Sequence, residues 1–512
     1  MTSPETTGHL DREAFCGRWD QGEPFAVSAR MPGDLLTPVA AFLRLRAART
    51  GPTFLLESVE GAAARGRYSF IGLDPDLIWR CREGAAEINR DPAHEPSNFQ
   101  PDGAAPFASL RALIAESAFA LDDGLPLMSA GLFGFLGYEM VRSMERLGPP
   151  RPSLIGTPDA ILIRPTATVV FDNVRDQITV VYVARPHPGK SALMGHEAAS
   201  DALEEILSIL ERPLPAAAEE PDVSAGKEFA PRSNMEPAGY EAMVARAKEY
   251  IAAGDIFQVV LSQRFEAPFG LPAFTLYRAL RRINPAPFLC YLDFEEFQIV
   301  CSSPEILVRV RDGTVTVRPI AGTRPRGATP AADEQLAADL LADPKERAEH
   351  LMLLDLGRND VGRVAESGTV SVTDSFFIER YSQVMHIVSN VEGRLRPDRD
   401  ALDALVAGFP AGTVSGAPKV RAMQIIDELE PDGRGPYAGC IGYFSPDGQM
   451  DTCIVLRTAV VRDGRMYVQA GAGIVYDSDP ASEGTECLNK AAALFRAADE
   501  ARRFASRSRR GQ

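Results

Sequence analysis

Residues 451–477 read DTCIVLRTAVVRDGRMYVQAGAGIVYD, a stretch in which strand-like runs follow one another with no helix between them. Runs rich in β-branched and aromatic residues and bounded by turn residues are typical of β-strands. The pattern recurs at FQVVLSQRFEA, PFLCYLDF, FQIVCSS and ILVRVRDGTVTVRPI. Because strands follow strands more often than they alternate with helices, the sequence predicts an α+β fold with large mixed, mainly antiparallel sheets.

The order of patterns along the chain predicts its organisation. Strand-like runs and a helix or two occupy 25–185, a helical segment lies near 192–211, and RPLPAAAEEPDVSAGKEFAPRSN (212–234) has the composition of a linker. Helices and strands then alternate irregularly to about 505. The predicted parts are an N-terminal arm (1–24), an N-terminal domain (25–185), a helix and linker (186–234), a second domain (235–505) and a tail (506–512).

Composition excludes several classes of function. The formal net charge of −16 and the pI near 5.0 argue against a nucleic-acid partner or an anionic membrane, which require a basic surface. The 7 cysteines form no C-x-x-C pair, so we expect reduced core thiols rather than a disulfide framework or a zinc site. No stretch approaches the roughly 18 apolar residues of a membrane span, and no secretory leader is visible. We therefore expect a cytoplasmic protein with no membrane partner.

One helix start carries two close carboxylates. In DPKERAEHLMLLDLGRND (343–360), Asp343 is a good N-cap, Pro344 suits the first helical position, and Glu346 falls where a capping box would place a glutamate. Glu346 could therefore serve only the helix end. Glu349 lies one turn further in and precedes an apolar run, so capping does not explain it.

A second copy of this pattern lies far downstream. DSDPASEGTECLNKAAALFRAADEARR (477–503) again begins with Asp-Pro, and Glu483 and Glu486 are three residues apart. Four carboxylates brought together would repel one another unless protons or a cation neutralised them. A hard divalent ion such as Mg²⁺ would do so, and the alternative is two solvated helix faces.

Four stretches in the second half carry a specific resemblance. RPIAGTRPRG (318–327), KERAEHLMLLDLGRND (345–360), FPAGTVSGAPK (409–419) and QAGAGIVYDSDPASEGTE (469–486) resemble, in this order, the chorismate-binding enzymes, which make anthranilate, aminodeoxychorismate, isochorismate or salicylate. The resemblance covers 235–505. LLES (55–58) and GLFGFLGYEMVR (131–142) resemble the N-terminal region of the anthranilate-forming members. The implied fold packs its sheets as a sandwich with helices outside.

The resemblance also implies a metal site. In this family the helix carboxylates hold Mg²⁺, which binds the ring carboxylate of chorismate. Glu349 and Glu486 match the direct ligands, and Glu346 and Glu483 match the flanking or water-mediated ones.

The second carboxylate of chorismate needs another anchor. Backbone N–H groups at glycines and an arginine fork are suited to bind it. GAGIV does not match a dinucleotide loop, because no third glycine follows at that spacing, whereas Arg457 alone could form an ordinary strand salt bridge. The positions that the resemblance assigns to substrate binding are Gly322, Thr323, Tyr437, Arg457, Gly471, Ala472 and Gly473.

Three residues match catalytic positions. Glu305, in CSSPE, resembles the general acid that protonates the departing hydroxyl, a role that requires a raised pKa; alone it could be a surface glutamate at a strand end. His386, in YSQVMHIVSNV, matches the histidine that assists loss of pyruvate, although a histidine in such a run is usually a core residue. Thr413 matches a further position of the site.

Two residues favour one chemistry within the family. Members that add water present a lysine where this chain has Gln258, and glutamine cannot act as that base. Aminodeoxychorismate synthases of the familiar type carry a nucleophilic lysine where this chain has Ala321. We therefore expect chorismate and ammonia to give anthranilate and pyruvate, the first committed step of tryptophan biosynthesis. The alternatives are aminodeoxychorismate synthesis and a non-catalytic amino-acid sensor or scaffold.

The resemblance finally implies an inhibitor and a partner. Tryptophan would bind at LLES and NPAPFL (284–289), where Phe288 and Leu289 replace the family's Tyr-Met. No glutaminase is visible, so we expect free ammonia, or glutamine through a separate amidotransferase subunit. The predicted tryptophan-site residues are Leu56, Glu57, Ser58, Pro287, Phe288 and Leu289.

Overall fold

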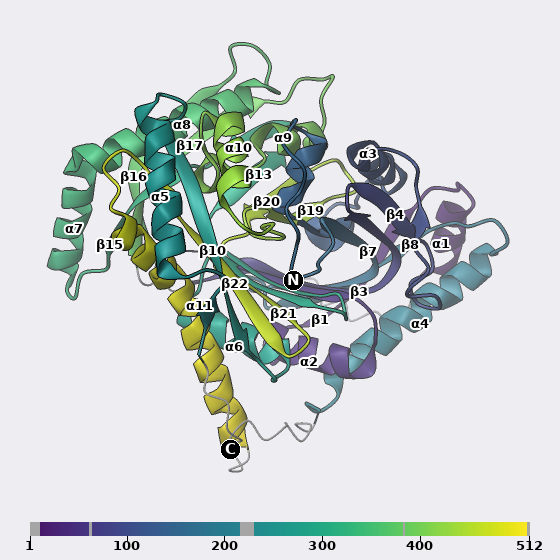
Figure 1. The fold of residues 1–512 in the computed structure, drawn as a ribbon. Helices are drawn as coiled ribbons and strands as arrows, with labels where there is room; N and C mark the ends of the chain where they lie inside the picture. The colour runs from purple at the N-terminus through teal and green to yellow at the C-terminus, as the bar shows by residue number, and fades with distance from the viewer. Residues whose placement is uncertain (1–10, 61–63, 216–229, 382–383, 509–512) are drawn as a thin grey trace.

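The computed structural model describes residues 11–60, 64–215, 230–381 and 384–508, and Figure 1 shows their course. The predicted arm, linker and tail each lie partly outside these residues. Every strand pairing in the described parts is antiparallel, and the strands form two layers joined into one hydrogen-bonded network. The predicted α+β class with mainly antiparallel sheets is confirmed.

Some of the strands of the second half form one end of the first sheet. Its order is β9 (Arg232–Ser233) and β18 (Gly416–Ala417) beside β10 (Gln258–Pro268), then β22 (Arg465–Ile474), β21 (Thr458–Arg462), β12 (Gln298–Ser303), β11 (Phe288–Asp293), β2 (Thr53–Glu60), β3 (Ala64–Arg82), β7 (Ala160–Asp172), β8 (Gln177–Ala184) and β1 (Phe25–Pro32).

The second sheet shares two strands with the first. Its order is β5 (Gln100–Pro101), β4 (Ala85–Asn89), β3, β7, β6 (Leu132–Leu136), β19 (Cys440–Phe444), β20 (Met450–Ile454), β13 (Ile306–Arg311), β14 (Thr314–Val317) with β15 (Ile320–Pro325), β17 (Val384–Arg394) and β16 (Ser371–Arg380).

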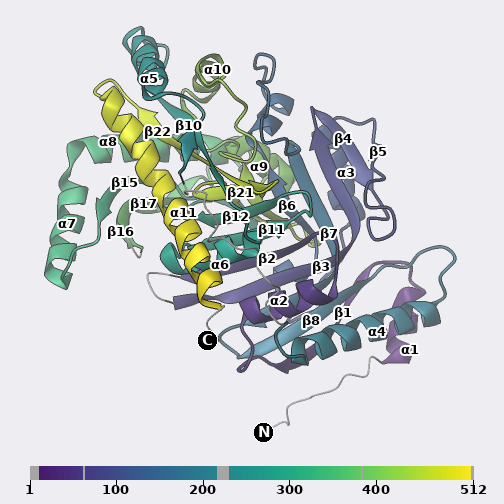
Figure 2. The same ribbon diagram turned by 60° about the horizontal axis from the view of Figure 1, so that its bottom comes forward.

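Helices cover the outer faces of both sheets. They are α1 (Arg12–Trp19), α2 (Pro38–Ala48), α3 (Pro106–Glu116), α4 (Ala192–Glu211), α5 (Pro237–Ala252), α6 (Ala273–Ile283), α7 (Pro330–Ala342), α8 (Pro344–Gly362), α9 (Ala401–Gly408), α10 (Lys419–Leu429) and α11 (Pro480–Ser508), with the short 3₁₀ helices η1 (Leu127–Ser129), η2 (Tyr138–Ser143) and η3 (Gly412–Val414). Figure 2 shows α2, α4, α6 and α11 along the first sheet.

Strand alternation explains the layers. Successive side chains point to opposite faces of a strand, so Phe54 and Phe70 pack between the sheets while Leu55 and Ile71 face the helices. The interior between the sheets is rich in aromatic and aliphatic residues of both layers. This arrangement confirms the expected sandwich with helices outside.

Strands β3 and β7 connect the two layers. Their pairing register shifts between Pro75 and Leu77, and Asp74 has a φ of 50°. Such a bulge bends a strand and lets it pass from one sheet to the other. Because β2 pairs with β11 and β6 with β19, the predicted segments 25–185 and 235–505 contribute to both sheets. The boundaries between them remain predictions.

Candidate functional site

Helix α8 begins as predicted. Asp343 is its N-cap, with Oδ1 accepting from the N–H groups of Lys345 at 2.9 Å and Glu346 at 3.3 Å, and Pro344 takes the first position. The capping-box interpretation of Glu346 is wrong, because the Asp343 N–H donates to Leu340 O at 3.4 Å. The Glu346 carboxylate instead accepts from Arg324 Nη1 at 3.0 Å.

Helix α11 is capped in the same way. Asp479 Oδ1 accepts from the Ser482 N–H at 3.0 Å. One turn beyond Glu486, Lys490 Nζ lies 2.7 Å from the Glu486 carboxylate and donates to Gly471 O at 2.9 Å. Lys490 therefore links α11 to the strand that carries the predicted anion-binding glycines.

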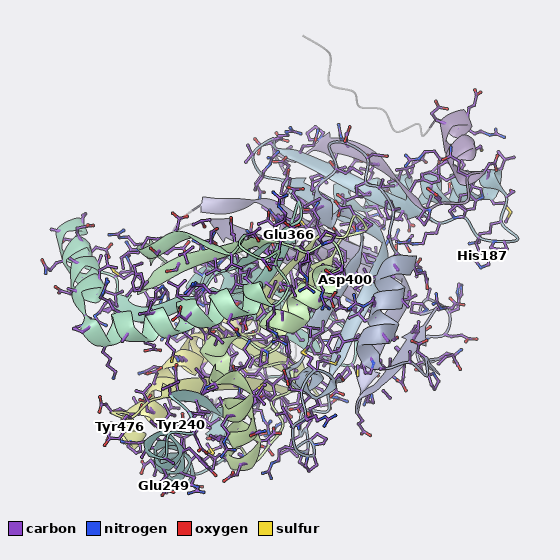
Figure 3. The ribbon with its side chains drawn as sticks, turned by 90° about the horizontal axis from the view of Figure 1, so that it is seen from above. His187, Tyr240, Glu249, Glu366, Asp400 and Tyr476 are labelled. Atoms are coloured by element: carbon purple, nitrogen blue, oxygen red, sulfur yellow. The ribbon has the colours of Figure 1, made fainter. Side chains whose placement is uncertain are left out.

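Tyr240 of α5 packs against the same part of α11. Its hydroxyl donates to Leu261 O at 3.1 Å and accepts from Cys487 Sγ at 3.2 Å. Figure 3 labels Tyr240 at this corner of the molecule, near Tyr476 in the segment between β22 and α11.

The first turns of α8 and α11 lie close enough to influence each other's charges. Burial raises the pKa of Glu349, and the negative charges of Glu346 on its own helix and Glu486 on the other raise it further. Burial also raises the pKa of Glu483, while Lys345 of α8 acts in the opposite direction. The structure thus brings the two predicted E-x-x-E pairs into one neighbourhood.

These carboxylates fit a hard divalent cation by chemistry. In the described parts of the chain, no three of them bring oxygens within 4.8 Å of one another. Mg²⁺ usually keeps several waters and needs only one or two carboxylates, so a closed cage is unnecessary. Gln258 Nε2, at 3.4 Å, donates a hydrogen bond to Glu349, and a cation would relieve the repulsion between Glu349 and Glu486.

Glu305 lies between β12 and β13 and is only 6% exposed. Burial raises its pKa to about 8. Thr413 Oγ1 donates to Glu305 Oε1 at 3.0 Å, and this hydrogen bond partly opposes the shift. At neutral pH the carboxyl group is therefore largely protonated and held in one orientation.

His386 in β17 is a neutral base, whereas Glu305 is a protonated acid. Its Nδ1 lies 2.8 Å from Gly322 O and 3.2 Å from Thr323 Oγ1. A carbonyl can only accept, so Nδ1 carries the hydrogen and Nε2 is an unprotonated acceptor. Burial, aided by the charge of Arg457, lowers the pKa of His386 to about 4, and Nε2 is buried with no partner among the described groups.

Arg457 lies between β20 and β21, and its positive charge acts on both Glu305 and His386. Arg457 has a φ of 49°, a left-handed conformation that costs on the order of 1–3 kcal/mol, and its guanidinium donates no hydrogen bond to a described residue. A Cβ on Gly471 would lie 2.9 Å from Tyr437 Oη, and one on Gly473 would lie 2.5 Å from Gln258 Nε2. A side chain at either position would therefore collide with Tyr437 or Gln258, and this close packing requires glycine.

A cavity of about 30 Å³ lies beside the predicted acid. Glu305, Thr413, Pro319, Leu353 and Asp360 contribute to its lining. A water molecule needs roughly 10–15 Å³, so this space admits little solvent and the mostly apolar lining keeps the Glu305 carboxyl group desolvated.

The predicted tryptophan-site segments lie side by side. Leu56 pairs with Cys290 and Glu57 with Leu289 across β2 and β11. The Glu57 carboxylate is buried and accepts from Tyr277 Oη at 2.6 Å and from Arg281 at 2.6 and 2.8 Å. The family resemblance predicts that the two segments meet. No local pattern in the sequence indicates these two partners, which come from α6.

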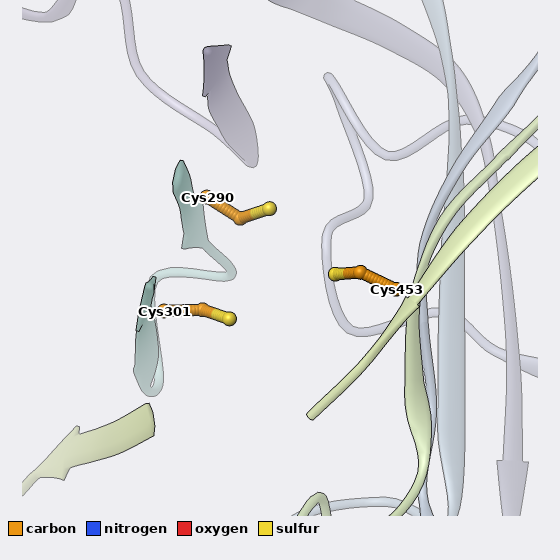
Figure 4. Close-up of side chains that lie close together, drawn as sticks. All are labelled: Cys290, Cys301 and Cys453. Carbon is orange, nitrogen blue, oxygen red and sulfur yellow. The ribbon is translucent and has the colours of Figure 1, made fainter. Parts of the chain in front are cut away.

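Three thiols gather elsewhere. Cys290, Cys301 and Cys453 bring their sulfur atoms within 4.8 Å of one another, and Figure 4 shows them pointing together. They lie in the apolar interior between the sheets. With only sulfur donors and an apolar surrounding, we interpret them as reduced core residues, as the sequence predicts.

Comparisons with known proteins show the family of the chain. The family model of the chorismate binding enzymes matches residues 60–496. The chain is 54% identical over 499 residues to anthranilate synthase component 1 of Cereibacter sphaeroides, covering 98% of this chain and 99% of that protein. It is 48% identical to the same component of Pseudomonas aeruginosa, covering 91% and 93%.

Solved structures give the same relationship. Anthranilate synthase component I of Streptococcus pneumoniae superposes with a TM-score of 0.76 at 39% identity, covering 91% of this chain and 98% of that one. The menaquinone-specific isochorismate synthase of Escherichia coli matches with a TM-score of 0.68 at 21% identity, which shows the shared fold alone. Within the described residues, no helix has the length and apolar character to cross a membrane.

Proposed function

The chain belongs to the chorismate-binding enzymes and, within them, to the anthranilate synthase component 1 family, and from this premise we propose that it converts chorismate and ammonia into anthranilate, pyruvate and water. The observation that carries the proposal is the pair Glu305 and His386. Burial keeps the first protonated and the second neutral at the same pH. The proposed reaction protonates a leaving group and then eliminates pyruvate. It therefore requires a protonated acid and a neutral base at the same pH.

Substrate binding would use two anchors. We assign one carboxylate of chorismate to Arg457, Tyr437 and the backbone of Gly471, Ala472 and Gly473. Gly322 and Thr323, which lie beside His386, would also contact the substrate. Glu349 and Glu486 would hold Mg²⁺ directly, with Glu346 and Glu483 flanking. Bound Mg²⁺ would supply positive charge to the ring carboxylate of the substrate.

In the first step ammonia forms a C–N bond while the ring C–O bond to the hydroxyl breaks. Glu305 donates the proton with which the hydroxyl leaves as water, and Thr413 keeps the carboxyl group oriented. Gln258 cannot act as a base, and ammonia needs none. Its Oε1 is buried, has no hydrogen-bond partner among the described residues, and is available to accept a hydrogen bond from ammonia.

In the second step the ring loses a proton and the bond between the ring carbon and the ether oxygen breaks, so that the ring becomes aromatic. The side chain leaves as the enolate of pyruvate, which takes up a proton to become pyruvate. His386 Nε2 accepts the proton that the ring loses. The Nδ1 hydrogen bond to Gly322 O fixes the tautomer and would stabilise the imidazolium that forms.

Ammonia would come from a separate glutamine amidotransferase, the second component that the family's name implies. Tryptophan would inhibit through Leu56, Ser58, Pro287, Phe288 and Leu289. Because Glu57 is already paired with Arg281, we assign it the role of fixing β2 against α6 in this site.

The test is the identity of the product. Purified chain with chorismate, Mg²⁺ and ammonium salt at high pH should form anthranilate, detected by fluorescence and by chromatography. Isochorismate or aminodeoxychorismate in its place would contradict the assignment. The absence of any product, with chorismate still bound, would favour a non-catalytic sensor.

A further inference from the structure

Behind Tyr437 lies a buried ion pair that neither step uses. Arg434 is 1% exposed and Glu430 is 3% exposed. Arg434 Nε donates to Glu430 Oε2 at 2.9 Å and Nη2 to Oε1 at 2.6 Å. A pair withdrawn from solvent is costly to form, and its replacement by apolar residues is often neutral or stabilising. Stability alone therefore explains it poorly.

The Glu430 end of the pair contacts the anion-binding strands. Glu430 Oε1 accepts from the Ser262 N–H at 2.7 Å and from Ser262 Oγ at 2.8 Å. Ser262 of β10 pairs directly with Gly471 of β22. The carboxylate thus fixes the strand that lies against the predicted anion-binding glycines.

The Arg434 end contacts the loop that carries Thr413. Nη1 donates to Val414 O at 2.7 Å, and Nη2 donates to Val260 O at 2.7 Å. The guanidinium also lies 5.5 Å from the centre of the Tyr437 ring. One side chain therefore reaches the peptide next to Thr413, a β10 carbonyl and the ring of Tyr437.

We propose that Arg434 is a positioning residue that fixes the Thr413 loop and the Tyr437 ring relative to each other through its ion pair with Glu430. The inference rests on the proposed function, because it needs Thr413 to orient Glu305 and Tyr437 to bind substrate. Arginine suits the role because its planar fork reaches several acceptors in fixed directions, whereas a lysine presents a single ammonium.

The decisive comparison separates stability from positioning. R434M removes the cation beside Glu430, leaves a buried carboxylate whose charge is no longer balanced, and should lower Tm. The double variant R434M/E430M removes both charges and should recover most of the lost Tm. Positioning predicts that the double variant still shows kcat/KM at least about tenfold below wild type, equivalent to a change of about 1.4 kcal/mol. Recovery of Tm and kcat/KM together would overturn the proposal.

A second measurement, the pH dependence of kcat/KM, reports on the proton donor Glu305. Loss of the Thr413 contact removes a hydrogen bond that favours ionised Glu305, so the alkaline limb of the rate should move to higher pH in the double variant. Arg457, Lys490 and Tyr381 also face Glu305, and none of them is changed. T413V should add little to the double variant, since both act on one contact. The proposal would be contradicted if the alkaline limb kept its wild-type position and the effects of T413V and the double variant on kcat/KM were fully additive.

Controls keep the outcomes distinct. R164M removes another buried arginine, whose partner Asp76 lies 2.7 Å away in the N-terminal half, and should lower Tm without changing kcat/KM. If the double variant does not fold, R434K keeps a charge beside Glu430 and should fold with reduced kcat/KM. Wild-type kcat/KM in R434K would overturn the proposal. If the wild-type chain itself formed no anthranilate, the proposed function would be refuted instead.

Discussion

Burial acts in opposite senses on the two residues at the centre of the site. It raises the pKa of Glu305 to about 8 and lowers the pKa of His386 to about 4. Each group keeps its neutral form, because the charged form loses hydration that nothing in the protein fully replaces. Between these values both residues are in the states that the proposed steps require.

The pH dependence of activity follows directly. We expect kcat/KM, corrected for the fraction of ammonia present as NH₃, to fall above about pH 8 as Glu305 ionises and below about pH 4 as His386 is protonated. E305Q should lower kcat by roughly 10²–10⁴ and remove the alkaline limb. The exposed Glu204→Gln on α4 is the matched control. A wild-type alkaline limb in E305Q would show that another group is the acid.

The same residue makes stability depend on pH. The folded pKa of Glu305 is about 8, above the ordinary value of 4.5. Its contribution is therefore fully present below pH 4.5 and is lost as the pH rises towards 8, because the unfolded chain releases the proton first. Urea unfolding at pH 5 and pH 8 should show a smaller loss of stability in E305Q than in wild type. Equal losses would mean that Glu305 ionises normally.

At this scale the sequence predicts which residues belong to the site but not their states. CSSPE identifies Glu305 only by resemblance, since its burial depends on packing against the distant Thr413 loop. The tautomer of His386 depends on a carbonyl of β15, 64 residues away in the chain. Neither fact is encoded in local spacing.

At the scale of elements, short sequence patterns predict where helices begin. They do not predict the contacts between one element and another. The Asp-Pro caps of α8 and α11 depend on neighbouring residues and were predicted. The Arg324 bond to Glu346 and the Lys490 bond to Gly471 O join separate elements and were missed. Such pairs arise only once the fold is formed.

The different surroundings of the two α8 glutamates give a testable ranking. Glu346 is already paired with Arg324, whereas among the described residues Glu349 has only the long hydrogen bond from Gln258. E349Q should therefore raise the Mg²⁺ concentration needed for half-maximal rate by at least about tenfold or abolish turnover, and E346Q should have a smaller effect. Glu334→Gln, exposed on α7, is the control. Equal effects of E346Q and E349Q would contradict the assignment of direct and flanking ligands.

At the scale of the whole molecule, the two halves of the chain share their sheets. The sequence predicts antiparallel sheets because many strands follow one another directly, and strands that are consecutive in the chain can pair through a short turn. It could not predict that β2 would pair with β11 or β6 with β19, since these pairings close long loops and leave no local pattern.

This interleaving predicts that the second half does not fold alone. A fragment 235–512 would expose β11 and β19 as unpaired edges, and open edges of apolar strands promote aggregation. We expect the fragment to aggregate, and co-expression with 1–234 to yield a soluble complex in gel filtration. A monomeric 235–512 fragment with cooperative thermal unfolding would show that the predicted domain boundary is a real one.

The central claim is that carboxylates from two distant helices converge on one divalent cation at the substrate. Crystals grown with chorismate and with Mn²⁺ in place of Mg²⁺ test it most directly, because manganese gives an anomalous signal. We predict one anomalous peak bonded to oxygens of Glu349 and Glu486. A structure with substrate bound, no peak there, and the two side chains pointing apart into solvent would contradict the account.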